Sequence, residues 1–145
     1  EGKKEEVKDV MDMTLCRLDR KKMILEYAAA NNPLWVVSKA NGTCELKDYE
    51  ADKMPVGMYI NENRFTLRKA EVKAGDRIYI FTDGYADQFG GDKGKKFKYR
   101  HLQELITAFQ DKSMKEQRDI LEKTMNEWKG NLEQVDDMLV IGIEV

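Results

Sequence analysis

The feature of this sequence that most limits its fold is a change of hydrophobic period just after residue 85. Before that point, short apolar runs alternate with polar residues and are separated by turn residues, as in antiparallel strands. After it, apolar residues recur at helical spacing over two segments. The last residues, 138–145, form an apolar run typical of a strand. The order predicts an α+β fold: several antiparallel strands, then two helices, then one strand.

The expected strands are bounded by turn residues. Asn41-Gly42 is the strongest hairpin signal in the chain, because both residue types accept the left-handed backbone that a tight turn needs. Residues 31–33 and 74–76 are also expected to be turns. We expect strands at 11–16, 23–30, 34–38, 43–49, 65–72, 77–81 and 138–145, with a loop at 50–63.

Two amphipathic helices are expected in the second half of the chain. Leu102, Leu105, Ile106 and Phe109 share one face of a helix at 99–110. The second helix is expected to begin at 113–116, where Ser-Met-Lys-Glu has the form of a capping box, and to end at Gly130. The apolar residues expected on its buried face are Ile120, Leu121, Met125 and Trp128.

Length and composition exclude several classes of protein. The 145 residues fit one domain, and the net charge of −2 argues against a dedicated nucleic-acid binder. No apolar run approaches the roughly 20 residues that span a bilayer, so we expect a cytoplasmic protein without membrane contact. A single histidine and two cysteines exclude a multi-histidine metal site, a zinc site and a disulfide framework.

Two acidic sites stand at the ends of expected buried strands. Asp83 follows the strand 77–81 and precedes Gly84, while Asp136 and Asp137 precede the strand 138–145. If these two strands are antiparallel neighbours, Asp83 and Asp136 converge. Converging carboxylates repel one another, and a hard cation such as Mg²⁺ or Mn²⁺ relieves that repulsion. Such a metal can activate water and hold phosphate oxygens.

Simpler interpretations of the same residues stay open. An Asp before a Gly is most often a turn residue, and Asp-Asp before a strand is often solvated charge. An aspartyl-nucleophile phosphotransferase of the DxDG type is excluded, because that motif needs an acidic residue where Phe81 stands. The glycine pair Gly90-Gly91 indicates backbone flexibility and lacks the fuller pattern of a phosphate-binding loop.

Several segments together resemble one known family. Ile-Tyr-Ile-Phe-Thr-Asp-Gly-Tyr-Ala-Asp-Gln-Phe-Gly-Gly at 78–91 and Gln-Val-Asp-Asp-Met-Leu-Val-Ile-Gly at 134–142 are similar to the SpoIIE-like bacterial serine/threonine phosphatases of the PP2C (PPM) superfamily. The segments 12–16, 30–35 and 53–57 also resemble that group. The resemblance runs from about residue 9 to residue 145, and the order and spacing of these short motifs make it specific.

The resemblance implies a fold, a reaction and a site. The fold is a PP2C-like antiparallel β-sandwich flanked by helices, and the reaction is metal-dependent hydrolysis of phosphoserine or phosphothreonine. Such domains are commonly the output part of a larger signalling protein, and their substrates are often anti-sigma-factor antagonists. Carried over by position, Asp83 and Asp136 are metal ligands for two Mn²⁺ or Mg²⁺ ions, Gly84 lets the backbone approach the site, and Asp137 is a neighbour of the metals.

One departure from the family pattern affects this expectation. The family carries a further metal-binding Asp in an N-terminal motif, and no such motif exists in this sequence. We therefore expect residues 11–145 to be the C-terminal portion of the domain, without its N-terminal strands and metal motif, and to be incomplete for catalysis. Residues 1–10 are expected to be a lead-in, the end of an upstream helix. Uncovered sheet edges would favour a homodimer.

Two other functions remain as alternatives. The chain could be a non-catalytic PP2C-like module that binds a partner protein through its helices, which the missing Asp motif favours. It could also be a strand-rich sensor of small ligands, which would have no use for the pairing of Asp83 with Asp136 and should not respond to divalent metals.

Overall fold

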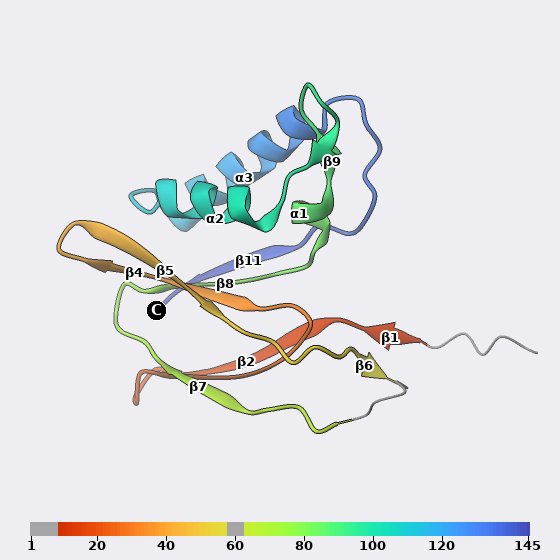
Figure 1. The fold of residues 1–145 in the computed structure, drawn as a ribbon. Helices are drawn as coiled ribbons and strands as arrows, with labels where there is room; N and C mark the ends of the chain where they lie inside the picture. The colour runs from red at the N-terminus through yellow and green to blue at the C-terminus, as the bar shows by residue number, and fades with distance from the viewer. Residues whose placement is uncertain (1–8, 58–62) are drawn as a thin grey trace, which may run out of the picture.

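The computed structural model describes residues 9–57 and 63–145 and arranges them in three layers (Figure 1). Two antiparallel sheets pack face to face, and the two longer helices cover the outer face of one of them. This is the α+β order that the change of hydrophobic period predicts, arranged as the antiparallel sandwich that the family resemblance implies. Of the expected lead-in, residues 1–8 lie outside the described residues, and Val10 belongs to a short strand.

The middle layer is a four-stranded sheet in the order β11-β8-β4-β5, and the outer layer is a three-stranded sheet in the order β2-β3-β7. The four strands of the middle layer are β4 (Leu34–Ala40), β5 (Thr43–Tyr49), β8 (Arg77–Phe81) and β11 (Val140–Glu144). The three strands of the outer layer are β2 (Met13–Asp19), β3 (Ile24–Ala30) and β7 (Arg68–Glu71). Two-residue strands form the pairs β1 (Val10–Met11) with β6 (Val56–Gly57) and β9 (Phe89–Gly90) with β10 (Lys95–Lys96).

The strand β8 is central in its sheet, as its apolar sequence predicts. It pairs antiparallel with β4 on one side and with β11 on the other. The hairpin at Asn41-Gly42 is also confirmed, because both residues have positive φ and Ala40 pairs with Thr43 across the turn. Within the described residues β11 has a strand neighbour on one side only. The expected homodimer stays a prediction.

Over residues 9–57 and 63–145, the helices are α1 (Gly84–Asp87), α2 (Tyr99–Ala108) and α3 (Met114–Lys129). The capping box at the start of α3 is confirmed: the Glu116 amide donates to Ser113 Oγ at 3.3 Å, and the Ser113 amide donates to Glu116 Oε2 at 2.8 Å. Among the described residues, no helix combines the length and the apolar character that crossing a membrane would require.

Two separate apolar cores hold the layers together. One lies between the two sheets, and the other lies between the middle sheet and the helices, where Trp35 and Tyr79 are almost completely buried. The buried faces expected for the two helices are confirmed, since Leu102, Ile106 and Leu121 pack into this second core. At about 25 cal/mol per Å² of apolar surface, such burial is the main favourable contribution to folding.

The structure departs from the sequence expectations at two strands. The strand expected at 11–16 is interrupted at Asp12 and continues as β2 to Asp19. Within β2, Leu15 is 66% exposed, and Cys16 on the opposite face packs between the sheets. The strand expected at 65–72 is shortened to β7. Before β7, the Thr66 amide donates to the Asp52 carboxylate at 2.7 Å.

Candidate metal centre

The site begins where β8 ends and β11 begins. Val140 lies opposite Phe81 in the antiparallel ladder, so the residues just after β8 face those just before β11. This is the neighbour relationship that the sequence analysis required for Asp83 and Asp136 to converge. The pairing continues past the strands, because the Thr82 amide donates to the Leu139 carbonyl at 3.0 Å.

Gly84 is in close contact with the backbone of the second acidic segment. A Cβ atom added at Gly84 would collide with the carbonyl group of Asp137 and would lie 3.3 Å from the carbonyl carbon of Asp136. The φ of Gly84 is not in the left-handed region, so glycine is needed here for space and not for its backbone freedom. The backbone of Gly84 thus lies against the Asp136-Asp137 backbone, and its role at a metal site stays a prediction.

Asp83 stands at the N-terminus of the short helix α1 and is partly buried. Burial raises the pKa of its carboxyl group, and the negative charges of Asp136, Asp87 and Asp12 raise it further. The charges of these three residues therefore reach Asp83, and each of them disfavours its ionised form. A cation bound at Asp83 would offset that unfavourable effect.

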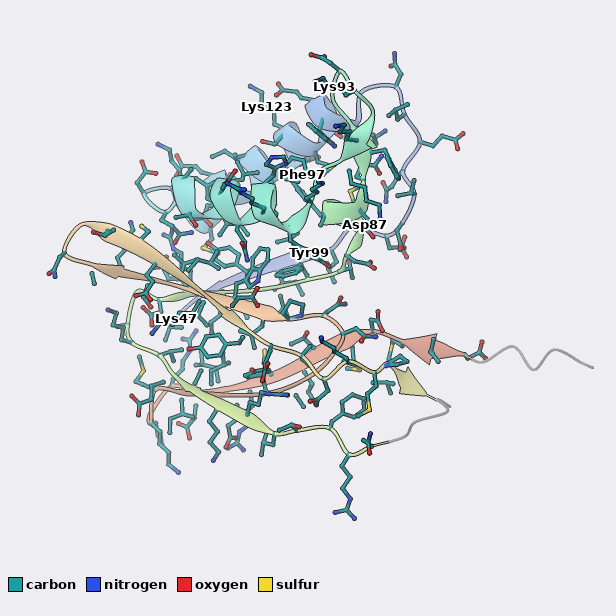
Figure 2. All side chains as sticks on the ribbon, in the orientation of Figure 1. Lys47, Asp87, Lys93, Phe97, Tyr99 and Lys123 are labelled. Atoms are coloured by element: carbon teal, nitrogen blue, oxygen red, sulfur yellow. The ribbon has the colours of Figure 1, made fainter. Side chains whose placement is uncertain are left out.

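Tyr99 forms the apolar border of the acidic cluster. Burial, followed by the charges of Asp83, Asp87 and Asp12, raises the pKa of its hydroxyl group to about 12. Its ring packs 5.8 Å from the ring of Phe81, centroid to centroid. Figure 2 shows Asp87 and Tyr99 beside α1, where the helical layer meets the sheets. The low polarity on this side strengthens the electrostatic interactions of the carboxylates.

The other acidic residues near Asp83 have partners of their own. The Asp87 carboxylate pairs with Lys96 Nζ at 3.1 Å. Asp12 Oδ1 accepts a hydrogen bond of 2.7 Å from the Asn31 side-chain amide. Asp136 Oδ1 accepts a hydrogen bond of 2.7 Å from the amide of the residue that follows it. Each carboxylate keeps a second oxygen, and carboxylate oxygen is the ligand that Mg²⁺ and Mn²⁺ prefer.

The donor set falls short of a complete metal site. Over residues 9–57 and 63–145, no three His, Cys, Asp or Glu side chains are placed so that they could hold one metal ion together. The residues present therefore do not by themselves fit the two-metal centre that the resemblance implies. Asp83 and Asp136 are brought to adjacent strand ends, as predicted, but their role as ligands stays a prediction.

Sequence reasoning missed four residues at this end of the molecule as members of the site: Asp12, Thr82, Asp87 and Gln88. The rule that singled out Asp83, a carboxylate at the end of a strand, gives no signal for Asp12, because Asp12 lies inside the strand expected at 11–16 and only the break between β1 and β2 places it at a strand end. Asp87 has no such signal, since only the folding of α1 turns it towards Asp83. Thr82 and Gln88 carry no charge and drew no attention in the sequence.

The glycine pair beside the site has a packing role. A Cβ at Gly90 would collide with the Trp128 carbonyl group, and a Cβ at Gly91 would come within 2.8 Å of the Trp128 ring. The Gly91 amide also donates to the Trp128 carbonyl at 2.8 Å. Close packing against α3 explains the glycine at position 90, and at position 91 this packing acts together with the left-handed backbone that favours glycine.

A family model described as Stage II sporulation protein E (SpoIIE) matches residues 3–145. The chain belongs to the SpoIIE family. The SpoIIE-like resemblance stated from the sequence is thereby confirmed, and the chain carries a phosphatase-type domain sequence. No curated protein sequence matches the chain significantly.

Solved structures show the same fold. The SiaA PP2C domain of Pseudomonas aeruginosa has 23% identity and a TM-score of 0.82 over 92% of this chain and 51% of that one. The PP2C phosphatase domain of SpoIIE from Bacillus subtilis, solved with a fragment of its regulatory domain, has 17% identity and a TM-score of 0.66 over 92% of this chain and 37% of that one. The structure of the same phosphatase domain presoaked with Mn has 17% identity and a TM-score of 0.61, over 92% of this chain and 56% of that one. This chain thus spans about half the length of the SiaA domain, and the PP2C-like fold is confirmed.

Proposed function

We propose that the protein containing this chain hydrolyses phosphoserine or phosphothreonine on a regulatory protein in a reaction that depends on Mn²⁺ or Mg²⁺. The observation that carries the proposal is the meeting of Asp83-Gly84 with Asp136-Asp137 at the paired ends of β8 and β11. Membership of the SpoIIE family supports the phosphatase class. Anti-sigma-factor antagonists are the proposed substrates, because the family resemblance implies them.

In this proposal Asp83 and Asp136 bind metal and neither is a nucleophile. Burial, followed by the charges of Asp136, Asp87 and Asp12, raises the pKa of Asp83, and a bound cation would favour its ionised form. The described residues supply only part of a ligand set, so we propose that further ligands come from other residues of the protein. The geometry of Gly84 brings the Asp136-Asp137 backbone close to Asp83.

The first test is phosphate release from a phosphoserine peptide with Mn²⁺, with EDTA as the control, on this chain and on the full-length protein. We expect metal-dependent turnover by the full-length protein, and its loss in Asp83→Asn and Asp136→Asn. The matched control is Asp92→Asn, which removes an exposed carboxylate from the loop before α2 and should leave turnover unchanged. Full activity of Asp83→Asn would refute the proposed role of that residue.

Turnover measured on this chain alone shows whether its own metal-binding residues are sufficient for catalysis. We expect no turnover by these 145 residues, because no three metal-binding side chains come together among those that the structure describes. Metal-dependent turnover by the chain alone would show that Asp83 and Asp136 suffice, with ligands from a second copy as one explanation.

The incomplete set of metal-binding side chains among the described residues also supports a second candidate function. A PP2C-like module without a complete metal site would bind a partner protein and not hydrolyse a phosphoester. A full-length protein that is folded, binds no Mn²⁺ and releases no phosphate would favour this alternative over catalysis.

A further inference from the structure

The segment 133–139, which carries Asp136, has no regular structure of its own. It lies between the end of α3 and the start of β11, and most of its side chains are exposed. An exposed segment without ladder or helix hydrogen bonds is free to open unless side chains from elsewhere hold its backbone. The position of Asp136 relative to Asp83 therefore depends on whatever holds this segment.

Thr82 holds the C-terminal end of the segment. Its hydroxyl group donates to the Asp137 carbonyl at 2.7 Å and accepts from the Leu139 amide at 3.0 Å. The hydroxyl group thus acts both as a donor and as an acceptor, to the residues on the two sides of Met138. The Thr82 amide adds a third bond to the Leu139 carbonyl at 3.0 Å. The residue directly before Asp83 is in this way joined to the residue directly after Asp136.

Gln88 holds the N-terminal half of the same segment. Its side chain is completely buried, its amide nitrogen donates to the Glu133 carbonyl at 2.8 Å, and its amide oxygen accepts from the Val135 amide at 3.4 Å. Gln88 is itself anchored, because its backbone carbonyl accepts from Trp128 Nε1 at 3.1 Å. A buried amide is costly unless its hydrogen bonds are made, so these contacts resist opening.

We propose that Thr82 and Gln88 are positioning residues that fix Asp136 against Asp83 by holding the segment 133–139 at its two ends. The two residues lie on either side of the stretch that contains Asp83, Gly84 and Asp87, so the side chains that hold the segment 133–139 come from the part of the chain that carries Asp83. Neither residue is proposed to touch metal or substrate. The inference rests on the proposed function for its purpose, but the hydrogen bonds that define it are independent of any metal.

The first test is amide hydrogen exchange on this chain, followed by NMR. Thr82→Val removes the hydroxyl group at nearly constant volume, and Thr82→Ser keeps it. We expect the Leu139 amide to exchange about five to ten times faster in Thr82→Val, because the variant removes the acceptor of that amide, and to return to within about twofold of wild type in Thr82→Ser. The Val145 amide, which donates to the Asp76 carbonyl, should exchange at the wild-type rate in all variants.

The controls separate positioning from general stability. Thr107→Val removes a hydroxyl group that donates to the Gln103 carbonyl within α2, and it should leave Leu139 exchange unchanged. Gln88→Met should accelerate exchange at Val135 more than at Leu139. An unchanged Leu139 rate in Thr82→Val, or no rescue by Thr82→Ser, would overturn the proposed role of Thr82. Equal acceleration at Val145 would reduce that role to ordinary structural stabilisation and would also overturn it.

A titration with Mn²⁺ alone connects the positioning residues to the proposed function. If the carboxylates bind Mn²⁺, paramagnetic broadening should appear at the Gly84 and Asp137 amides, and Thr82→Val should need about ten times more Mn²⁺ than Thr82→Ser for the same broadening. Equal titrations for the two variants would overturn the link between position and binding. Absence of broadening in wild type would count against metal binding by these carboxylates, while the exchange rates still decide whether Thr82 and Gln88 hold the segment.

Discussion

The backbone of Gly84 lies directly against the carbonyl group of Asp137, although more than fifty positions separate the two residues in the chain. The contact exists because β8 and β11 pair and because α1 begins where β8 ends. It makes Gly84 a spatial requirement of the site, since even a methyl group has no room there.

Replacing Gly84 by Ala should therefore displace the Asp136 segment or destabilise the fold. The added Cβ meets backbone atoms, which cannot rotate away as a flexible side chain would, and overpacking of this kind costs about 1–3 kcal/mol. Urea unfolding would measure the loss. Gly94→Asn is the matched control, because a side chain there meets no atom within 4 Å and Asn accepts its left-handed backbone. A Gly84→Ala variant as stable as Gly94→Asn would contradict the contact.

Asp83→Asn should stabilise the isolated chain at neutral pH. The folded-state pKa of Asp83 lies above its ordinary value, so folding takes up protons and stability falls as pH rises through the interval between the two values. Above that interval, the ionised carboxylate opposes folding because of burial and the charges of Asp136 and Asp87. A neutral amide removes that penalty.

The measurement is the free energy of unfolding of wild type and Asp83→Asn at pH 7 and at successively lower pH. The advantage of the variant should be greatest at pH 7 and should shrink as wild-type Asp83 becomes protonated. Asp92→Asn serves as the exposed control and should show no such trend. A variant less stable than wild type at pH 7 would mean that the Asp83 carboxylate is held by favourable contacts instead.

Asp52 should show the opposite dependence on pH. Its hydrogen bond with Arg68, at 2.7 Å, and those with Thr66 lower the pKa of the Asp52 carboxyl group to about 2. Its contribution to stability is present above the unfolded-state pKa near 3.8 and is lost as pH falls towards 2. Asp52→Asn should cost about 1 kcal/mol at pH 7, because the pair is partly exposed and screened by solvent.

Acid titration of the free energy of unfolding would test this prediction for wild type and Asp52→Asn. The difference between them should disappear below about pH 2, the folded-state pKa of Asp52. The Arg118–Asp119 pair, at 2.7 Å, provides the control, since both of its side chains are more than half exposed. Asp119→Asn should leave the free energy of unfolding nearly unchanged, because an exposed pair contributes little. Equal losses in the two variants would contradict the role given to the Asp52 site.

Removal of the Tyr79 hydroxyl group should be more costly than removal of the Tyr85 hydroxyl group. Tyr79 Oη donates to Gln117 Oε1 at 2.6 Å and accepts from Gln110 Nε2 at 2.8 Å, and all three groups are buried. Tyr79→Phe leaves two buried amides with a lost partner and should cost about 2–3 kcal/mol. Tyr85 donates one hydrogen bond, to the Leu121 carbonyl at 2.9 Å, so Tyr85→Phe should cost about 1 kcal/mol. Thermal and urea unfolding would rank the two variants.

Local sequence patterns predicted most of the secondary structure. The Asn41-Gly42 turn and the Ser113 capping box are decided by residues a few positions apart, so their chemistry is visible in the sequence. The exposed face of β2 could not be predicted in this way. Leu15 and Cys16 are both compatible with burial, and only the position of the second sheet decides which of the two packs inside.

The candidate site was predictable only in part. Charge at the ends of apolar strands pointed to Asp83 and Asp136, because a carboxylate in that position needs a partner. The presence of Asp12 and Asp87 near them depends on contacts between distant segments, which one sequence without its fold does not reveal. The same holds for Thr82 and Gln88, whose side chains are ordinary until the backbone of 133–139 is placed against them.

The sequence by itself determined the α+β class, the order of strands and helices, the central place of β8 and the family of the chain, because each depends on local period, turn chemistry or ordered motifs. Only the tertiary structure decided that Gly84 contacts Asp137, that Gly90 and Gly91 pack on Trp128, and that two uncharged side chains hold the Asp136 segment. These relationships join residues far apart in the chain, and the free energy of packing and buried hydrogen bonds, which no local pattern contains, brings them together.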